Sequence, residues 1–104
     1  MRVAIIFRQR SAAPFEALPM MMEALGQWVD TYSNRATTIE FFAMGGGLVL
    51  ADFDDASELH RLVAENPFTA FMDVEVIPII EPTAAMETWG QAVAAVTGAA
   101  QPAA

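Results

Sequence analysis

The chain has 104 residues, of which 55% are hydrophobic, and it contains no cysteine. This length fits a single domain, and the apolar fraction exceeds that of disordered chains. The net charge is −8 and the five basic residues are scattered arginines, which excludes the basic stripe of a protein that binds nucleic acid or anionic membranes. No apolar run reaches the length of a membrane span, and the first residues lack a signal-peptide pattern, so we expect a cytoplasmic protein.

The first third of the chain predicts a strand followed by a helix. Residues 2–8, "RVAIIFR", are an apolar, β-rich run bounded by charge, which is typical of a buried strand. From Phe15 to Tyr32, apolar residues recur at steps of three and four, which places one stripe along a helix. Because Pro19 lies inside this pattern, the helix starts near it or bends there.

Two strands joined by glycines are predicted next. The segment "TTIEFFAMGGGLVLADF" predicts strands at about 37–43 and 47–53, with a hairpin at Gly45, Gly46 and Gly47. A phosphate-binding glycine loop leads into a helix, whereas this one leads into another strand. The glycines therefore indicate a turn and not a nucleotide site.

Two further helices are marked by their ends. Asp55 stands three residues before Glu58, which is the spacing of a helix-capping pair, and Asn66-Pro67 ends that helix. Pro82 starts a last helix, along which one face is apolar at Met86, Trp89, Val93 and Val96.

The stretch 66–80, "NPFTAFMDVEVIPII", contains the fourth strand. Side chains alternate along a strand, so Asp73 and Glu75 share a face. In an antiparallel pair with the first strand, these acids lie near Arg8 and Arg10. The pattern indicates either an ion pair across the strands or the polar rim of a pocket.

The element order is β-α-β-β-α-β with an added C-terminal helix. This order predicts an α+β fold, the ferredoxin-like sandwich, as one domain over residues 1–97 with a flexible tail at 98–104. The strands at 2–8 and 48–51 are apolar on both alternating sets of side chains, so both faces of the sheet need cover, while two helices cover one. We therefore expect a two-fold homodimer with its sheets face to face.

The stretch from residue 36 to residue 82 resembles muconolactone isomerase and its relatives in the dimeric α/β-barrel superfamily. The family pattern is a helix containing Leu-His, then Pro-Leu/Phe, an aromatic residue, and Met-Asp-Ile/Val-Glu-Val. It matches this chain at Leu59-His60, Pro67-Phe68, Phe71 and residues 72–76. The segment "DVEVIPII" is also similar to short uncharacterised bacterial proteins of the same group. The second strand departs from the isomerase, because it has "TTIEFF" in place of basic and aromatic residues.

The resemblance implies a bacterial homodimer, or a ring of dimers, with a pocket for a small organic molecule between sheet and helices. Members include lactone isomerases, cofactor-free monooxygenases, polyketide cyclases and haem-degrading enzymes. We expect acid–base chemistry of the isomerase type, without a cofactor, on a lactone- or enol-like substrate. A cofactor-free monooxygenase and a non-enzymatic binding or structural protein are the alternatives.

Three side chains are candidates for proton transfer. Glu40 lies in the apolar stretch "IEFF", and burial there would raise its proton affinity, as a general base requires. Glu75 lies in the family-like motif and is a second candidate. His60, the only histidine, would return the proton. Because one histidine without any cysteine supplies too few ligands for zinc, we expect no metal site. Glu40 also fits an edge-strand charge, and His60 a histidine at a helix border.

The candidate ligand contacts are Arg8, Met22, Trp28, Tyr32 and Phe42. The methionine and the aromatic residues would line a deformable pocket, and Tyr32 or Arg8 would hold an enolate oxygen. Aromatic and methionine residues at helical spacing are also typical of a plain core.

Overall fold

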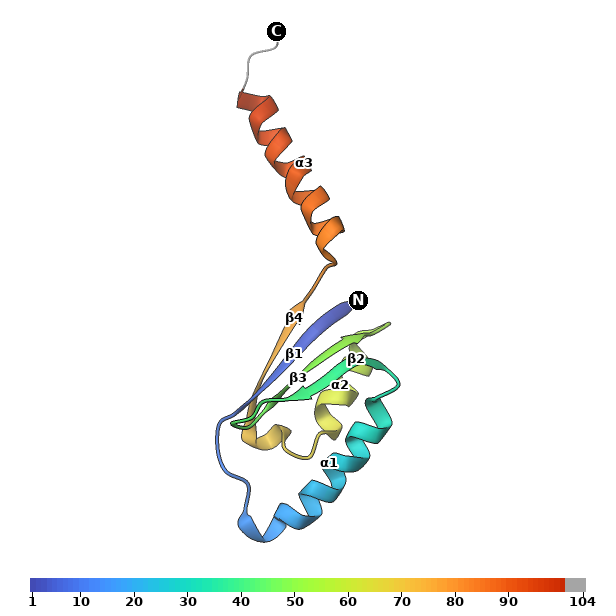
Figure 1. Ribbon diagram of the computed structural model, residues 1–104, viewed down its shortest axis with the longest axis vertical. Helices are drawn as coiled ribbons and strands as arrows, with labels where there is room; N and C mark the ends of the chain where they lie inside the picture. The colour runs from blue at the N-terminus through green and yellow to red at the C-terminus, as the bar shows by residue number, and fades with distance from the viewer. Residues whose placement is uncertain (101–104) are drawn as a thin grey trace.

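The structure, a computed structural model, describes residues 1–100 of the chain. Figure 1 shows a body made of one sheet and two helices, from which a third helix projects. In chain order, the strands and helices are β1 (Arg2–Gln9), α1 (Leu18–Tyr32), β2 (Ala36–Phe41), β3 (Gly47–Asp52), α2 (Ala56–Glu65), β4 (Met72–Pro78) and α3 (Pro82–Ala100). Single 3-10 turns precede α1 at Phe15–Ala17 and β4 at Thr69–Phe71.

The four strands form one antiparallel sheet in the order β2-β3-β1-β4. β1 therefore lies inside the sheet, and β2 and β4 are its edges. This arrangement confirms the predicted α+β, ferredoxin-like fold with an added C-terminal helix.

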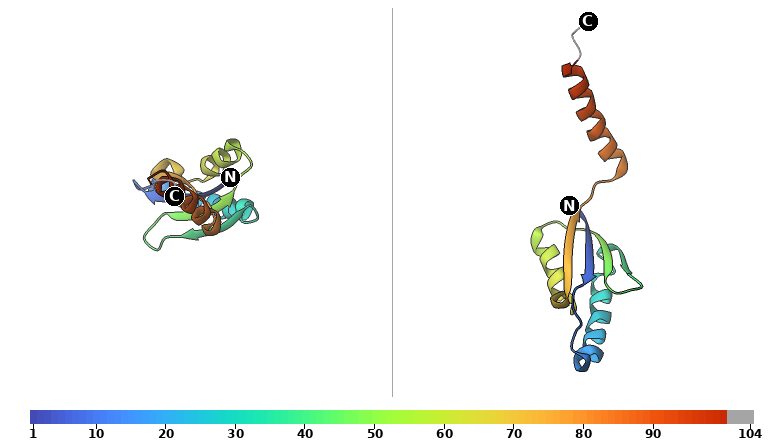
Figure 2. Two further views of the ribbon diagram at one scale, coloured as in Figure 1. Left: turned by 90° about the horizontal axis from the view of Figure 1, so that it is seen from above. Right: turned by 90° about the vertical axis from the view of Figure 1, so that its left-hand side faces the viewer.

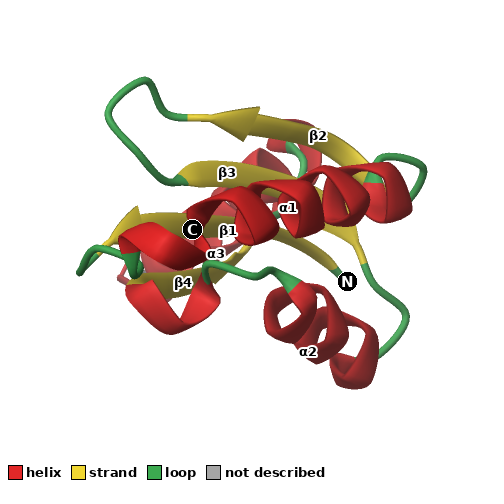
Figure 3. Cartoon of the chain, turned by 90° about the horizontal axis from the view of Figure 1, so that it is seen from below, coloured by secondary structure: helices red, strands yellow, loops and turns green. Residues whose placement is uncertain are grey.

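The helix-covered face of the sheet holds the core. Figure 3 shows α1 and α2 on the same side of the strands. Alternate residues of β1 and β3 are buried on this side because strand side chains alternate, and each large apolar one contributes roughly 1.5–3 kcal/mol. With residues of the two helices and the loop after β3, they form one cluster: Val3, Ile5, Phe7, Trp28, Tyr32, Val49, Ala51, Phe53 and Leu62.

Helix α1 begins as predicted near Pro19, which lies in its first turn. Its buried side chains are Met21, Trp28 and Tyr32. Met22 lies on the same face of α1 as Leu18 and Leu25, as steps of three and four predict, although it is 56% exposed, and the adjacent Met21 is buried as well. Trp28 Nε1 donates a hydrogen bond to the Leu62 carbonyl oxygen at 2.9 Å and joins α1 to α2.

The glycine hairpin between β2 and β3 is confirmed. Phe42 N–H donates to the Gly46 carbonyl oxygen at 2.9 Å, and the loop turns through Gly45 and Gly46 at φ values of +106° and +86°. Residues with a side chain rarely adopt these angles, which explains the glycines. The strands are slightly shorter than predicted, since β2 ends at Phe41 and β3 ends at Asp52.

The predicted ends of α2 are also confirmed. The Asp55 side chain accepts a hydrogen bond from Glu58 N–H at 3.0 Å, and the Glu58 carboxylate accepts one from Asp54 N–H at 3.0 Å. These bonds satisfy donors that the first helical turn leaves free. Asn66 is the C-terminal cap, as expected for a residue before proline.

Within residues 1–100, no helix lies against the other side of the sheet. We call this side the open face. Strand register places five apolar side chains at its centre, which are Ala4, Ile6, Leu48, Leu50 and Ile77. The sequence correctly predicted apolar residues on both sides of the sheet.

Helix α3 projects away from the sheet and the other two helices (Figure 2). The molecule is therefore elongated, with extents of 74 × 27 × 23 Å. The helix reaches Ala100, so residues 98–100 of the predicted tail are helical, and residues 101–104 lie outside the described part. Within residues 1–100, no helix is both long and apolar enough to cross a membrane.

Candidate functional site

A pocket of about 520 Å³ lies between the helix-covered face of the sheet and α1. Most of its wall is apolar and aromatic. The strands contribute to its floor, α1 covers it, the segment before β4 closes one side, and the hairpin forms the rim. These parts supply, among others, Phe7, Leu18, Met22, Leu25, Trp28, Ile39, Phe41, Phe42, Val49, Phe68, Phe71 and Met72.

The glycine hairpin forms the rim because it packs closely on the end of β1. A Cβ atom added to Gly46 would lie 2.1 Å from the Phe7 carbonyl oxygen, and one added to Gly45 would lie 2.7 Å from Gln9 Oε1. Only residues without a side chain allow this approach. The approach brings Phe41 and Phe42, which are both exposed, to the mouth of the pocket.

Asn66 supplies a buried polar group to this wall. It is 7% exposed, and its Oδ1 accepts a hydrogen bond from Phe68 N–H at 2.9 Å. Within residues 1–100, no hydrogen bond from its Nδ2 to another residue is found. Asn66 also lines the pocket. It can donate to a ligand oxygen.

Three of the five predicted ligand contacts line the pocket. They are Met22, Trp28 and Phe42. Trp28 offers a ligand only its ring, because its N–H already binds the Leu62 carbonyl oxygen. Arg8 and Tyr32 do not line the pocket.

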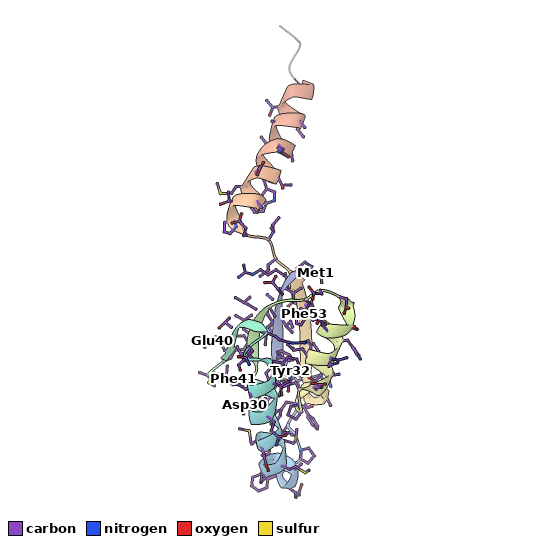
Figure 4. The ribbon with its side chains drawn as sticks, turned by 90° about the vertical axis from the view of Figure 1, so that its right-hand side faces the viewer. Met1, Asp30, Tyr32, Glu40, Phe41 and Phe53 are labelled. Carbon is purple, nitrogen blue, oxygen red and sulfur yellow. The ribbon has the colours of Figure 1, made fainter. Side chains whose placement is uncertain are left out.

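Tyr32 has a structural role between the helices. Its Oη donates a hydrogen bond to the Glu65 carboxylate, and Figure 4 shows the ring between α1 and α2. Burial and then the bond to Glu65 raise the pKa of Tyr32 to about 12. The phenol is therefore protonated and already engaged, so the structure does not support its predicted role at an enolate oxygen.

Glu40 lies at the edge of the body (Figure 4), and its side chain is on the open face. It pairs in register with Leu48, and its carboxylate accepts a hydrogen bond from Thr38 Oγ1 at 3.3 Å. Glu40 is among the residues that line the pocket, although strand alternation turns the side chains of Ile39 and Phe41 toward it and that of Glu40 to the other face. The carboxylate is exposed in this chain, in contrast to the predicted buried base.

Glu75 and Asp73 also lie on the open face, and both meet arginines. Arg8 Nη1 is 2.9 Å from Glu75 Oε2, and Arg10 Nη1 is 3.7 Å from Asp73 Oδ1. The interpretation as ion pairs across strands is confirmed. All four side chains are more than half exposed, so each pair contributes little stability, about 0–1 kcal/mol.

His60 is exposed on α2 and does not line the pocket. The structure therefore does not place Glu40, His60 and Glu75 around one cavity. In the part of the chain that is described, no three His, Asp or Glu side chains are grouped so that they could hold a metal ion.

The polar part of the pocket was not predicted from the sequence. Gln9, Ser11 and Asn66 all line it, but none belongs to a recognisable catalytic motif. Asn66 was identified only as the end of a helix. The signal available was its position beside Phe68 in the family-like stretch.

Comparison with protein families decides the classification. Residues 7–93 match the model described as a domain of unknown function, DUF3303. The chain belongs to this family. The match spans the end of β1, the other three strands, α1, α2 and more than half of α3. No curated protein matches the sequence of this DUF3303 chain.

Solved structures show the fold of this DUF3303 chain in other proteins. Muconolactone isomerase is 11% identical, with a TM-score of 0.65 over 79% of this chain and 92% of its own. The 5-chloro-2-hydroxyhydroquinone dehydrochlorinase of Burkholderia phenoliruptrix AC1100, in complex with 2,5-dihydroxybenzoquinone, is 13% identical. Its TM-score is 0.59 over 78% of this chain and 96% of its own. These similarities confirm the predicted fold and the resemblance to muconolactone isomerase.

Proposed function

We propose that this DUF3303 chain binds a small organic molecule that has a planar ring with a ring carbonyl group. The observation that carries the proposal is the buried residue Asn66, which lines a pocket whose wall is mostly apolar and aromatic. Such a combination, with few polar groups in an apolar wall, is typical of small-molecule sites, and about 300–1,000 Å³ is their usual volume. An Asn N–H that donates to a carbonyl oxygen would fix the orientation of the ring.

The two solved structures support this ligand class. One is named for a lactone, and the other was solved with a dihydroxybenzoquinone, so both names point to small rings with carbonyl oxygens. A ring of this kind would pack between Phe7, Trp28 and Phe71, which line the pocket of this chain.

The arrangement favours binding over the isomerase chemistry that the resemblance implies. A general base must come within about 3 Å of the proton it removes. Glu40 and Glu75 are on the open face, and His60 is outside the pocket wall. No residue of the pocket is therefore identified as a catalyst for acid–base turnover or for the monooxygenase alternative, whereas the pocket wall itself supports binding.

A homodimer is the second part of the proposal. Its support is the open face, where the apolar side chains of β1, β3 and β4 have no cover from α1 or α2. Monomers rarely expose a continuous apolar surface of this kind.

Isothermal titration calorimetry with muconolactone and with 2,5-dihydroxybenzoquinone tests the binding site. The informative variant is Met22→Trp, because Met22 lines the pocket from an exposed position on α1. Met20→Trp is the matched control, since Met20 is exposed on the same helix but does not line the pocket. We expect saturable binding of at least one ring, weakened about tenfold or more by Met22→Trp and less than about twofold by Met20→Trp. Absence of binding, or equal effects of the two variants, would overturn the proposal.

A further inference from the structure

The pocket is larger than a single ring requires. Its volume is about 520 Å³. An apolar cavity of about 150 Å³ is enough to hold benzene, so the pocket offers roughly three times the space of one ring. A bare ring at Asn66 would leave the remaining space to water, although most of the wall is apolar. The ring of the proposed ligand therefore fills only part of the site.

The lining side chains differ strongly in their exposure to water. Phe7 and Trp28 are each 3% exposed, and their rings meet edge to face with centroids 6.1 Å apart. Three other apolar lining residues are 42–58% exposed, namely Met22, Phe41 and Phe42. The buried side chains belong to the enclosed end of the pocket, and the exposed ones belong to its mouth. A substituent on an enclosed ring would therefore extend past the exposed residues.

Both the helix and the hairpin present apolar side chains to this part of the pocket. On α1 these are Leu18, Met22 and Leu25, which are four and three residues apart and so share one face of the helix. Their row covers about 10 Å along the helix axis. The end of β2 and the hairpin contribute Phe41 and Phe42. A continuous exposed apolar surface beside a cavity is typical of a groove that receives a ligand.

We propose that the ligand carries an apolar chain of several carbons on its ring, with the ring at the enclosed end and the chain in the mouth. The chain lies along the α1 row and covers the Phe42 ring. This inference rests on the binding function proposed above and specifies its ligand class further.

The side chains of the α1 row favour a flexible chain over a second planar ring. Leucine and methionine offer aliphatic surface, and methionine, with three rotatable bonds, adapts to groups of irregular shape. The aromatic side chains that would stack on a ring include Phe7 and Trp28 at the enclosed end. The two parts of the pocket therefore suit two different parts of one ligand.

Isothermal titration calorimetry with 2-methyl-, 2-propyl- and 2-hexyl-1,4-benzoquinone tests the chain. The protein has neither cysteine nor lysine, so it offers no side-chain thiol or amine that would react with a quinone. Each methylene that is fully removed from water strengthens binding about fourfold. Because the mouth leaves one side of the chain in water, we expect about twofold for each methylene, which is roughly thirtyfold between methyl and hexyl.

Two variants locate the chain. Phe42→Ser removes an apolar group from the mouth, and Met44→Ser is the matched control, since Met44 is 94% exposed on the same hairpin but does not line the pocket. We expect Phe42→Ser to reduce the ratio of hexyl to methyl affinity about fivefold or more, and Met44→Ser to change it less than about twofold. Both side chains are exposed, and circular dichroism checks that both variants fold.

The wild-type series separates this inference from the binding function on which it rests. If the methyl ligand binds and the hexyl ligand binds no more tightly, the binding function is retained and the apolar chain is overturned. If no member of the series binds, both are overturned. A ratio of hexyl to methyl affinity that falls equally in Phe42→Ser and Met44→Ser would show that the chain does not lie in the mouth, which also overturns the inference.

Discussion

Glu40 and Glu75 stand at the two ends of one row across the sheet, with Leu48 and Ile6 between them, on the face opposite the pocket. Three strand spacings separate their backbones, which is about 14 Å. Two groups that act on one substrate bond must each lie within hydrogen-bonding distance of it. Within one chain, these carboxylates therefore form no acid–base pair, either with one another or with the pocket.

We first predict that both carboxylates are dispensable for ligand binding. Glu40→Gln and Glu75→Gln should each change the dissociation constant of a ring carbonyl ligand by less than about twofold, because the strand register directs both side chains to the open face of the sheet. Isothermal titration calorimetry measures this effect, with Met22→Trp as the variant that does lose affinity. Loss of binding in Glu40→Gln would restore this residue as a member of the site.

Local signals were sufficient to predict most of the fold. Gly45 and Gly46 adopt positive φ angles, and Asp55 caps α2 through Glu58, so each of these features is decided within a few residues. Such short-range patterns can be recognised in the sequence without knowledge of the tertiary structure. The element order followed from them.

The orientation of the strands was harder to predict, and the site depended on it. Residues of β1 are apolar on both sides, so the alternation in "VAIIF" does not indicate which side meets the helices. The same ambiguity applied to β2. The sequence allowed the Glu40 side chain to face a cavity, whereas the register turns the neighbouring side chains of Ile39 and Phe41 to the side of the pocket. Asn66 was missed because one residue serves both as a helix end and as part of the pocket wall.

Substitution of Gly46 should destabilise the hairpin at the pocket mouth. In Gly46→Ala, the new Cβ would lie 2.1 Å from the Phe7 carbonyl oxygen, at a φ of +86° that alanine avoids. We expect a loss of about 1–3 kcal/mol in the free energy of unfolding, measured by urea denaturation.

The matched control is Gly26→Ala on α1, where nothing lies within 4 Å of the added Cβ. Alanine is the better helix former, so this variant should gain about 0.5–1 kcal/mol. Equal effects at the two positions would show that the hairpin does not press on β1.

Tyr32 should make the stability of the protein fall at high pH. Its pKa is about 12 in the fold, above the ordinary value near 10, so between these values the folded state holds a proton that the unfolded state has lost. The stabilisation is complete below pH 10 and decreases from there to pH 12, by up to about 1.4 kcal/mol per pH unit. The chain has one tyrosine and neither lysine nor cysteine, so no other side chain titrates in this range.

Urea unfolding at pH 8, 10 and 11 measures this dependence. In Tyr32→Phe the free energy of unfolding should be lower at pH 8, because the bond to Glu65 is lost, and nearly constant up to pH 11. A wild-type protein whose stability is unchanged between pH 10 and 11 would contradict the buried, protonated phenol.

The last prediction separates the two roles of Asn66. In Asn66→Asp, a carboxylate oxygen can still accept the hydrogen bond from Phe68 N–H, but the Nδ2 donor is replaced by an acceptor. A ligand carbonyl would then face a like partial charge, and we expect its affinity to fall about tenfold or more, which corresponds to at least about 1.4 kcal/mol. Calorimetry measures the affinity, and circular dichroism checks that the fold persists. Asn34→Asp makes the same chemical change at an exposed position and should leave binding unaltered. If Asn66→Asp binds as tightly as the wild type, the amide is only a helix cap, and the ligand is held by the aromatic wall alone.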